Sequence, residues 1–205
     1  MNNSSIITSR KGHAFLHNTA DLDTDRIIPA QFLKCVTFEG LGEHVFHDDR
    51  KQAKGEHPFD LEINKGKPIL VTGANFGSGS SREHAVPALM QWGIEAIIAP
   101  SFSDIFTGNA GGNGLVCAVV SLEDHALICA LVEQGTNVIE INLETSTISV
   151  GESQFDFSMP EAIRSSFLEG SWDSIAVALE AGNLIEQCAA KLPAFRTSLA
   201  LEAAA

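Results

Sequence analysis

Basic residues are scarce in this chain, and their scarcity limits the partners that it can have. The 205 residues include 13 lysines and arginines against 26 aspartates and glutamates, which gives a net charge of −13. This charge repels nucleic acids and anionic lipid surfaces, so neither is expected as a partner. A few local cations would therefore have to hold any anionic substrate.

Long apolar runs are also missing. No stretch of about 18 apolar residues is present to span a bilayer, and the N-terminal segment MNNSSIITSRKGHAFLHN has no secretory hydrophobic region followed by a small-residue cleavage site. We therefore expect a cytoplasmic protein without a membrane partner. Hydrophobic residues make up 44% of the chain and charged residues 19%, a balance typical of a globular protein and not of a disordered one.

Cysteine is rare, and the four that occur are far apart. We interpret them as buried thiols because they lie in apolar surroundings without C-x-x-C spacing; they are Cys35, Cys117, Cys129 and Cys188. An iron–sulfur cluster usually needs three or four closely arranged thiolates, so this chain alone is not expected to hold one.

There is no P-loop, Arg82 replaces the third glycine of a G-x-G-x-x-G pattern, and G-x-S-x-G does not occur. A nucleotide ligand and an acyl-enzyme mechanism are therefore not expected.

Apolar periodicity predicts an α/β fold. Short apolar runs at 67–75, 95–102 and 114–120 are typical of buried parallel strands, and helical spacing after Ser80 predicts a βαβ unit. A helix is predicted over 122–134, with acidic residues in its first turn and Gly135 beyond its end. Residues 137–157 alternate apolar with polar residues, which indicates antiparallel strands with one wet face.

Less regular segments flank this pattern. The acidic DLDTD, residues 21–25, is predicted to be a turn after a strand, and the polar stretch 40–67 a long surface excursion. Three short helical segments are predicted between 160 and about 192, broken near Gly170 and Gly182, before a fraying tail over 193–205. With its core at about 10–158, the whole chain, 1–205, is expected to form one domain.

The stretch NFGSGSSREHAVPAL, residues 75–89, brings glycines, serines and an arginine together between a predicted strand and a predicted helix. One interpretation is structural: Ser80 and Glu83 have the S-x-x-E spacing of a capping box, so Ser80 would cap the helix and Glu83 would complete the cap. The other is functional. Arg82 would lie in the first helical turn, where the dipole disfavours a cation, and this suggests a carboxylate ligand bound in bidentate fashion.

Three segments together resemble a known family. DTDRIIPAQFL (23–33), NFGSGSSREHA (75–85) and IAPSFSDIFTGN (98–109), in this order and spacing, are similar to the small subunits of isopropylmalate isomerase, or 3-isopropylmalate dehydratase. These small subunits are the swivelling domains of the aconitase superfamily. The resemblance covers about residues 10–195 and implies a three-layer β/β/α swivelling domain with short C-terminal helices. It also implies a separate large subunit that carries a 4Fe-4S cluster, with the active site between the two chains.

The resemblance assigns roles residue by residue. It implies that Ser80, as an alkoxide, is the base that removes a proton from an alkyl-malate substrate, while the cluster iron acts as a Lewis acid on the substrate hydroxyl and carboxylate. It implies that the substrate is bound by Ser81, Arg82 and Asp25, with Phe32 and Leu33 in the segment that governs specificity and would suit an isopropyl group. Gly77 and Gly79 would allow the backbone to approach the substrate, and His84 would either orient this loop or bond a buried carbonyl. No residue of this chain is expected to bind a metal.

Departures from the family pattern leave the substrate open. Ser78 stands where cysteine is common, Thr107 where an aromatic residue is common, and residues 110–113 replace a Ser-Phe-Asn-Asn-like run in a predicted active-site loop. A related hydro-lyase for a methyl-substituted malate, such as citramalate or dimethylmalate, is therefore an alternative to the isopropylmalate enzyme of leucine biosynthesis. A non-catalytic anion-binding module that kept the fold is another.

Two further clusters are interpreted as structural. Three aspartates, at 21, 23 and 25, begin like a calcium loop, but Arg26 replaces the required glycine and Phe32 the final glutamate. Three histidines could be a zinc set, but they lie in the polar excursion and are expected to face water; they are His44, His47 and His57.

Overall fold

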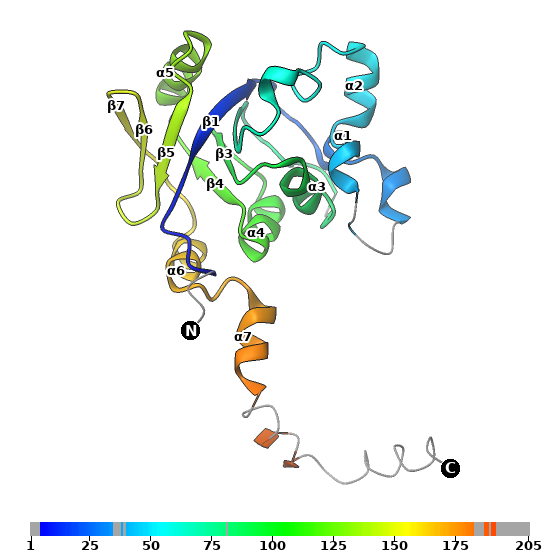
Figure 1. Ribbon diagram of the computed structural model, residues 1–205, viewed down its shortest axis with the longest axis vertical. Coiled ribbons are helices and arrows are strands. Elements are labelled where there is room, and N and C mark those ends of the chain that lie inside the picture. Colours follow the sequence, from blue (N-terminus) through cyan, green and yellow to red (C-terminus); the bar gives the residue numbers. More distant parts are fainter. Residues whose placement is uncertain are drawn as a thin grey trace.

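A seven-stranded mixed sheet forms the centre of the computed structural model (Figure 1). The structure describes residues 5–34, 38, 40–80, 82–182, 187–188 and 190–191. Within them the strands lie side by side in the order β4-β3-β2-β1-β5-β6-β7. Their bounds are β1 Ser9–His17, β2 Ile69–Thr72, β3 Ala96–Ala99, β4 Val116–Val119, β5 Val138–Asn142, β6 Thr147–Val150 and β7 Ser153–Asp156. The predicted α/β class is confirmed.

The first half of the sheet is parallel. Ala14 of β1 pairs with Ile69 of β2, Ile69 with Ala96 of β3, and Ala96 with Val116 of β4. All four residues of β2 and of β3 are buried, as predicted for strands covered on both faces. Because the strands are parallel, the loops that follow β1, β2 and β3 leave the sheet at the same edge, which is where ligands bind in such sheets.

Helices cover one face of the parallel half, and the antiparallel half covers the other. Residues of α1 (Thr24–Ile27), α3 (Ala85–Trp92) and α4 (Asp104–Asn113) share a core with Phe15, Leu70 and Ile97 of the strands. A second core joins the opposite face to β5, β6 and β7, with α5 (Leu122–Glu133) and α6 (Glu161–Glu169). The predicted helix after β4 and the predicted antiparallel strands are thus confirmed.

The predicted surface excursion over 40–67 is wrong. It contains the short helices η3 (Leu41–His44) and η4 (Glu62–Asn64) and the helix α2 (His47–Ala53), and four of its apolar side chains are at most 1% exposed: Leu41, Val45, Phe46 and Phe59. Phe59 contacts the rings of Phe15 and Trp92, so the excursion packs on β1 and α3. The error arose because isolated aromatic residues in a polar stretch have no periodicity, although each of them anchors a turn in the core.

His57 was expected to face water and is instead 5% exposed, in edge contact with His17 at the end of β1. The Nδ1 atom of His57 accepts a hydrogen bond from the Phe59 amide, 3.2 Å away. Among the described residues, the Nε2 atoms of both histidines are buried without a hydrogen-bond partner. Burial lowers the pKa of His17 from 6.5 to about 3 and also lowers the pKa of His57.

We therefore expect the protein to lose stability as the pH falls from 6.5 toward 3. Below pH 6.5 the unfolded chain binds more protons at His17 and His57 than the folded chain does, and for His17 this difference lasts until the pH nears 3, so unfolding becomes easier as the pH falls. Each histidine contributes at most about 1.4 kcal/mol per pH unit. Urea unfolding between pH 7.5 and 5 measures this slope, and a His17→Phe variant should show a flatter one. An equal decline in the parent and the variant would contradict the expectation.

The glycine-rich segment after Thr107 was expected to be a loop and is helical. Residues 110–113 form the last turn of α4, which ends at Gly114. Gly111 is buried where the helix passes Ile163 of α6, so that a Cβ at Gly111 would lie 2.9 Å from the Ile163 side chain. Glycine fits here because two helices pack closely at this position. A local sequence pattern does not reveal such a contact.

The C-terminal part is helical as far as it is described. Helices α6 and α7 (Ser174–Glu180) are separated near Gly170 as predicted, and Figure 1 shows α7 leading away from the sheet. The predicted third segment is only partly within the described residues, and the tail over 193–205 lies outside them.

Cys117 and Cys129 are buried as expected, Cys188 is exposed, contrary to expectation, and Cys35 lies outside the described residues. None of the described helices is long and apolar enough to cross a membrane.

The short helix η2, Ala30–Lys34, follows α1 and contains Phe32 and Leu33. Both side chains are half-buried and pack against the core on the helix-covered face.

Candidate active site

The loops that follow β1, β2 and β3 are joined at the carboxyl edge of the parallel strands. We call residues 75–80, which lead from β2 toward α3, the serine loop. On one side the Gly77 amide donates to the Leu22 carbonyl at 2.7 Å, and Asp23 pairs with Ser78 in a parallel bridge. On the other side Phe76 pairs with Phe102. The serine loop is thus held between two neighbouring loops by backbone contacts.

Gly77 is the position at which the serine loop most needs glycine. Its φ angle is +74°, and a Cβ built there would lie 2.3 Å from Cγ of Phe106. Phe106 is 2% exposed and packs edge-on against Phe76, with ring centroids 5.2 Å apart. Gly79 has φ +91°, and its Cβ would lie 3.4 Å from Asp23, so it has more room. The glycines were predicted to admit a substrate; the structure shows that Gly77 admits the Phe106 ring of α4.

The predicted helix cap at Ser80 is wrong. Helix α3 begins at Ala85, its N-cap residue is His84, and no side chain caps it. Two glycines at positive φ and the pairing with residues 22–24 keep the chain non-helical through Ser80. Pro87 was the sequence signal for the true start, because proline is tolerated in the first turn of a helix and not in its interior. A helix capped by Ser80 would have placed Pro87 in its interior.

Ser80 is exposed at the end of the serine loop. Its carbonyl accepts a hydrogen bond from the Thr24 hydroxyl, 2.8 Å away. The neighbouring Ser81 lies outside the described residues. Ser80 is therefore accessible from outside the chain.

Arg82 and Asp25, which the sequence placed in separate motifs, form an ion pair. Arg82 Nη1 also donates to the Ile28 carbonyl at 3.0 Å. The Arg82 side chain is 13% exposed and that of Asp25 is 54% exposed. The guanidinium is therefore largely buried, whereas the carboxylate faces solvent. Arg82 precedes α3 and is not in its first turn, so the dipole argument for a ligand was wrong; the pairing with Asp25 is what brings the two candidate residues together.

Each residue of the Asp23-Thr24-Asp25 triplet has its own role. The Asp23 carboxylate caps α1 by accepting from the Arg26 amide at 2.7 Å, Thr24 bonds Ser80, and Asp25 pairs with Arg82. The Asp21 carboxylate accepts from the Asn75 side chain at 2.8 Å. The aspartates that resembled a calcium loop thus point to different partners. Within the described residues there is no group of three or more histidine, cysteine or acidic side chains that could hold a metal ion.

Thr24 is the residue that sequence reasoning missed. It lies inside a segment that was singled out for Asp25 alone, and a buried threonine in a short turn has no distinctive signal. The backbone of Thr24 also donates to the Ser78 carbonyl at 2.8 Å, and its side chain is 3% exposed. It contacts the serine loop by both its backbone and its side chain.

Two other predicted residues, Phe32 and His84, make aromatic contacts. The Phe32 ring stacks on the His44 ring with centroids 3.9 Å apart, and its edge meets His47, so the histidines first considered as zinc ligands cover an aromatic side chain. The His84 ring meets the Phe38 ring edge-on at 5.2 Å. In the described part of the chain no hydrogen bond is made by the His84 ring.

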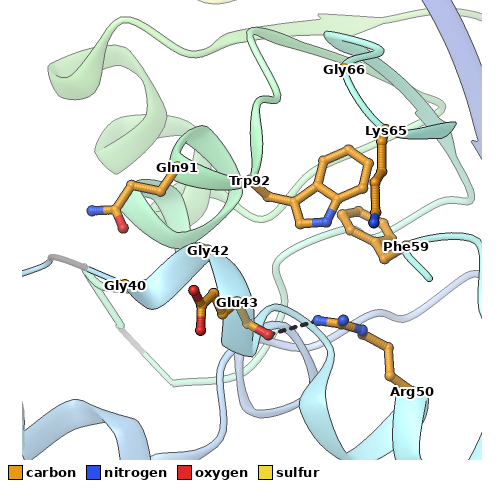
Figure 2. Close-up of a pocket in the computed structure, with 9 residues that line it drawn as sticks. All are labelled: Gly40, Gly42, Glu43, Arg50, Phe59, Lys65, Gly66, Gln91 and Trp92. Atoms are coloured by element: carbon orange, nitrogen blue, oxygen red, sulfur yellow. Dashed lines mark hydrogen bonds between the residues drawn. The ribbon is translucent and has the colours of Figure 1, made fainter. Parts of the chain in front are cut away.

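A cavity of about 600 Å³ lies beside the C-terminal end of α3 (Figure 2). Gln91 and Trp92 of the helix line it, together with Glu43, Arg50 and Lys65 from other segments. Ser80 and Arg82 are not among its lining residues. The candidate site is therefore separate from this cavity.

A profile of the aconitase C-terminal domain matches residues 4–122. The chain belongs to the aconitase C-terminal domain family. The matched region of this family member contains all three segments on which the resemblance was based. It also contains every residue of the site described above and ends at the start of α5.

Named relatives of this aconitase C-terminal domain extend the match to the antiparallel half. The 3-isopropylmalate dehydratase small subunit of Synechocystis is 43% identical over 174 residues, 84% of this chain and 87% of the relative. That of Thermus thermophilus is 42% identical over 187 residues, 89% and 93% of the two chains. The crystal structure of 3-isopropylmalate dehydratase from Methanocaldococcus jannaschii, at 26% identity, superposes with a TM-score of 0.63 over 85% of this chain and 99% of that one. The predicted family is confirmed.

Proposed function

We propose that this chain is the small subunit of a two-chain 3-isopropylmalate dehydratase of leucine biosynthesis. The enzyme would interconvert 2-isopropylmalate and 3-isopropylmalate by dehydration and rehydration through isopropylmaleate. Relatives that carry this name are 40–43% identical to most of this chain. The observation that carries the proposal is the exposed Ser80 next to the Asp25–Arg82 pair, at the edge where the parallel strands end.

Ser80 would act as the base that removes the proton from the substrate carbon. A serine alkoxide is a costly species in water, and oriented N–H groups and a nearby cation lower that cost once water is excluded. The start of α3 is too far along the chain to help as first expected, because the helix begins at Ala85. We assign the stabilisation instead to Arg82, which follows Ser80 and is held by the Ile28 carbonyl.

Arg82 would bind a carboxylate of the substrate. Its guanidinium is already oriented by Ile28 and Asp25, so less conformational freedom is lost when the substrate binds. Asp25 is more exposed than Arg82, so an incoming carboxylate can take its place on the guanidinium. We further propose that Ser81 binds substrate, that His84 supports the loop, and that Phe32 and Leu33 lie toward the alkyl group.

A second chain would complete the site. Ser80 is exposed here, whereas the chemistry requires a site from which water is excluded. Among the described residues no group of three or more histidine, cysteine or acidic side chains could hold a metal ion, and we propose that the large subunit would hold the 4Fe-4S cluster. The residues of this chain would handle the proton and the carboxylate, and the chain would form a single swivelling domain that docks by this edge.

The test is reconstitution. Both subunits are purified, mixed under anaerobic conditions, and offered 3-isopropylmalate, citramalate and dimethylmalate, with the formation of the unsaturated acid followed by its absorbance. We expect turnover of 3-isopropylmalate with both chains and none with either chain alone. Preference for a methyl-substituted malate would transfer the proposal to the related hydro-lyase, and binding without turnover of any of them would support a non-catalytic module.

A further inference from the structure

Within the described part of the chain, Ser80 takes part in few hydrogen bonds. Among the described residues, the hydrogen bond from the Thr24 hydroxyl to the Ser80 carbonyl, 2.8 Å long, is the one that involves Ser80. Ser80 belongs to neither a strand nor a helix, since β2 ends at Thr72 and α3 begins at Ala85. The preceding Gly79 has φ +91° and restricts the chain little. The position of Ser80 therefore depends strongly on Thr24.

Thr24 itself is well anchored. Its side chain is 3% exposed, its amide donates to the Ser78 carbonyl at 2.8 Å, and its carbonyl accepts from the Ile28 amide at 3.0 Å. It is the first residue of α1, whose N-cap, Asp23, pairs with Ser78. The next residue, Asp25, pairs with Arg82. A single short helix thus contacts the serine loop at Ser78 and at Ser80, and its Asp25 also pairs with the Arg82 guanidinium.

We propose that Thr24 is a positioning residue for Ser80, an inference that rests on the proposed function of Ser80 as base. The Thr24 hydroxyl fixes the Ser80 carbonyl and, through it, the backbone from which the Ser80 hydroxyl projects. A base must lie within hydrogen-bond reach of the proton that it removes, and a displacement of about 1 Å can cost on the order of 100-fold in rate. Thr24 does not touch the substrate; its effect is on turnover through Ser80.

Two substitutions at Thr24 and a matched control test this. Thr24→Val keeps the shape and loses the hydroxyl, and Thr24→Ser keeps the hydroxyl. Thr72→Val is the control, because Thr72 is also buried and its hydroxyl also donates to a carbonyl, that of His17 at 3.0 Å, and neither residue belongs to the serine loop. All three are assembled with the large subunit, and kcat, KM and the urea midpoint are measured.

We expect Thr24→Val to lower kcat by about 10- to 100-fold while KM changes by less than about threefold. Thr24→Ser should restore kcat to within about threefold of the parent. Thr72→Val should lose a similar amount of stability and keep its kcat. Equal losses of kcat in Thr24→Val and Thr72→Val, or no rescue by Thr24→Ser, would overturn the inference and reduce Thr24 to a structural role.

A measurement without turnover separates this inference from the proposed function. Backbone ¹⁵N order parameters are recorded for the full small subunit alone. In Thr24→Val we expect those of residues 78–80 to fall from about 0.85 toward 0.6, and in Thr72→Val we expect no change there. If the parent enzyme turned over none of the alkyl-malates, the proposed function would fail, and the order parameters would still decide the role of Thr24. Unchanged values in Thr24→Val would refute it.

Discussion

Replacing Ser80 by alanine is expected to lower kcat of the assembled enzyme by about 10²- to 10⁴-fold, the usual contribution of a general base. The hydroxyl is the group that we assign to proton removal, and alanine has nothing in its place. KM should change little, because the carboxylate contact that we propose belongs to Arg82, which keeps its bonds to Ile28 and Asp25. Stability should change by less than about 0.5 kcal/mol, because Ser80 is exposed.

The measurement is a steady-state assay of the reconstituted pair, with urea unfolding of the small subunit alongside. Ser149→Ala is a suitable control, since Ser149 is also exposed and lies on β6 in the antiparallel half. Its kcat should equal that of the parent. If Ser80→Ala kept a rate near that of the parent, the base would have to be another residue. Thr24 would then not position the catalytic base.

Replacing Gly77 by alanine is expected to destabilise the folded chain by roughly 3 kcal/mol. About 1–2 kcal/mol comes from a φ angle that L-residues avoid, and about 1–3 kcal/mol from forcing a methyl group into a filled core. The added Cβ would lie 2.3–2.6 Å from three atoms of the Phe106 side chain, which is buried and cannot move away without disturbing Phe76. The serine loop would shift with it, so activity should fall too.

Gly66→Ala isolates the steric part of this effect. Gly66 has the same φ angle, +74°, and nothing lies within 4 Å of the position of its Cβ. Urea unfolding should show a loss of only about 1–2 kcal/mol for Gly66→Ala. A Gly77→Ala variant no less stable than Gly66→Ala would show that the Phe106 ring yields easily, and the tight contact would then have no role in shaping the loop.

The strands and helices of this protein were predictable where the pattern is local. The buried runs of β2, β3 and β4 and the alternation of β5, β6 and β7 were read correctly because burial on both faces and burial on one face produce different periodicities. The helix start at Ala85 was missed, because the S-x-x-E spacing points to a start at Ser80 and Pro87, which lies in the first turn of the true helix, was not part of that argument. The core position of Phe59 was missed because a single buried aromatic residue in a polar stretch produces no periodic pattern of apolar residues.

The candidate residues were named from the sequence, whereas the contacts between them could not be predicted from it. Ser80, Arg82 and Asp25 were named from short motifs, and the structure brings Arg82 and Asp25 into contact. Their distance in the sequence hides the pairing, which depends on two parallel strands ending at one edge. Thr24 was invisible for the same reason, as its hydroxyl meets a carbonyl contributed by a different loop.

By itself, the sequence determined the family, the alternation of strands and helices, and the chemical groups of the candidate site, because these follow from residue types at short spacings. Only the tertiary structure decided that Ser80 ends an open loop and does not cap a helix, that Gly77 makes room for Phe106, and that Thr24 holds Ser80. These are contacts between segments far apart in the chain. Their energies depend on the distance between atoms after folding, for which no local pattern is a substitute.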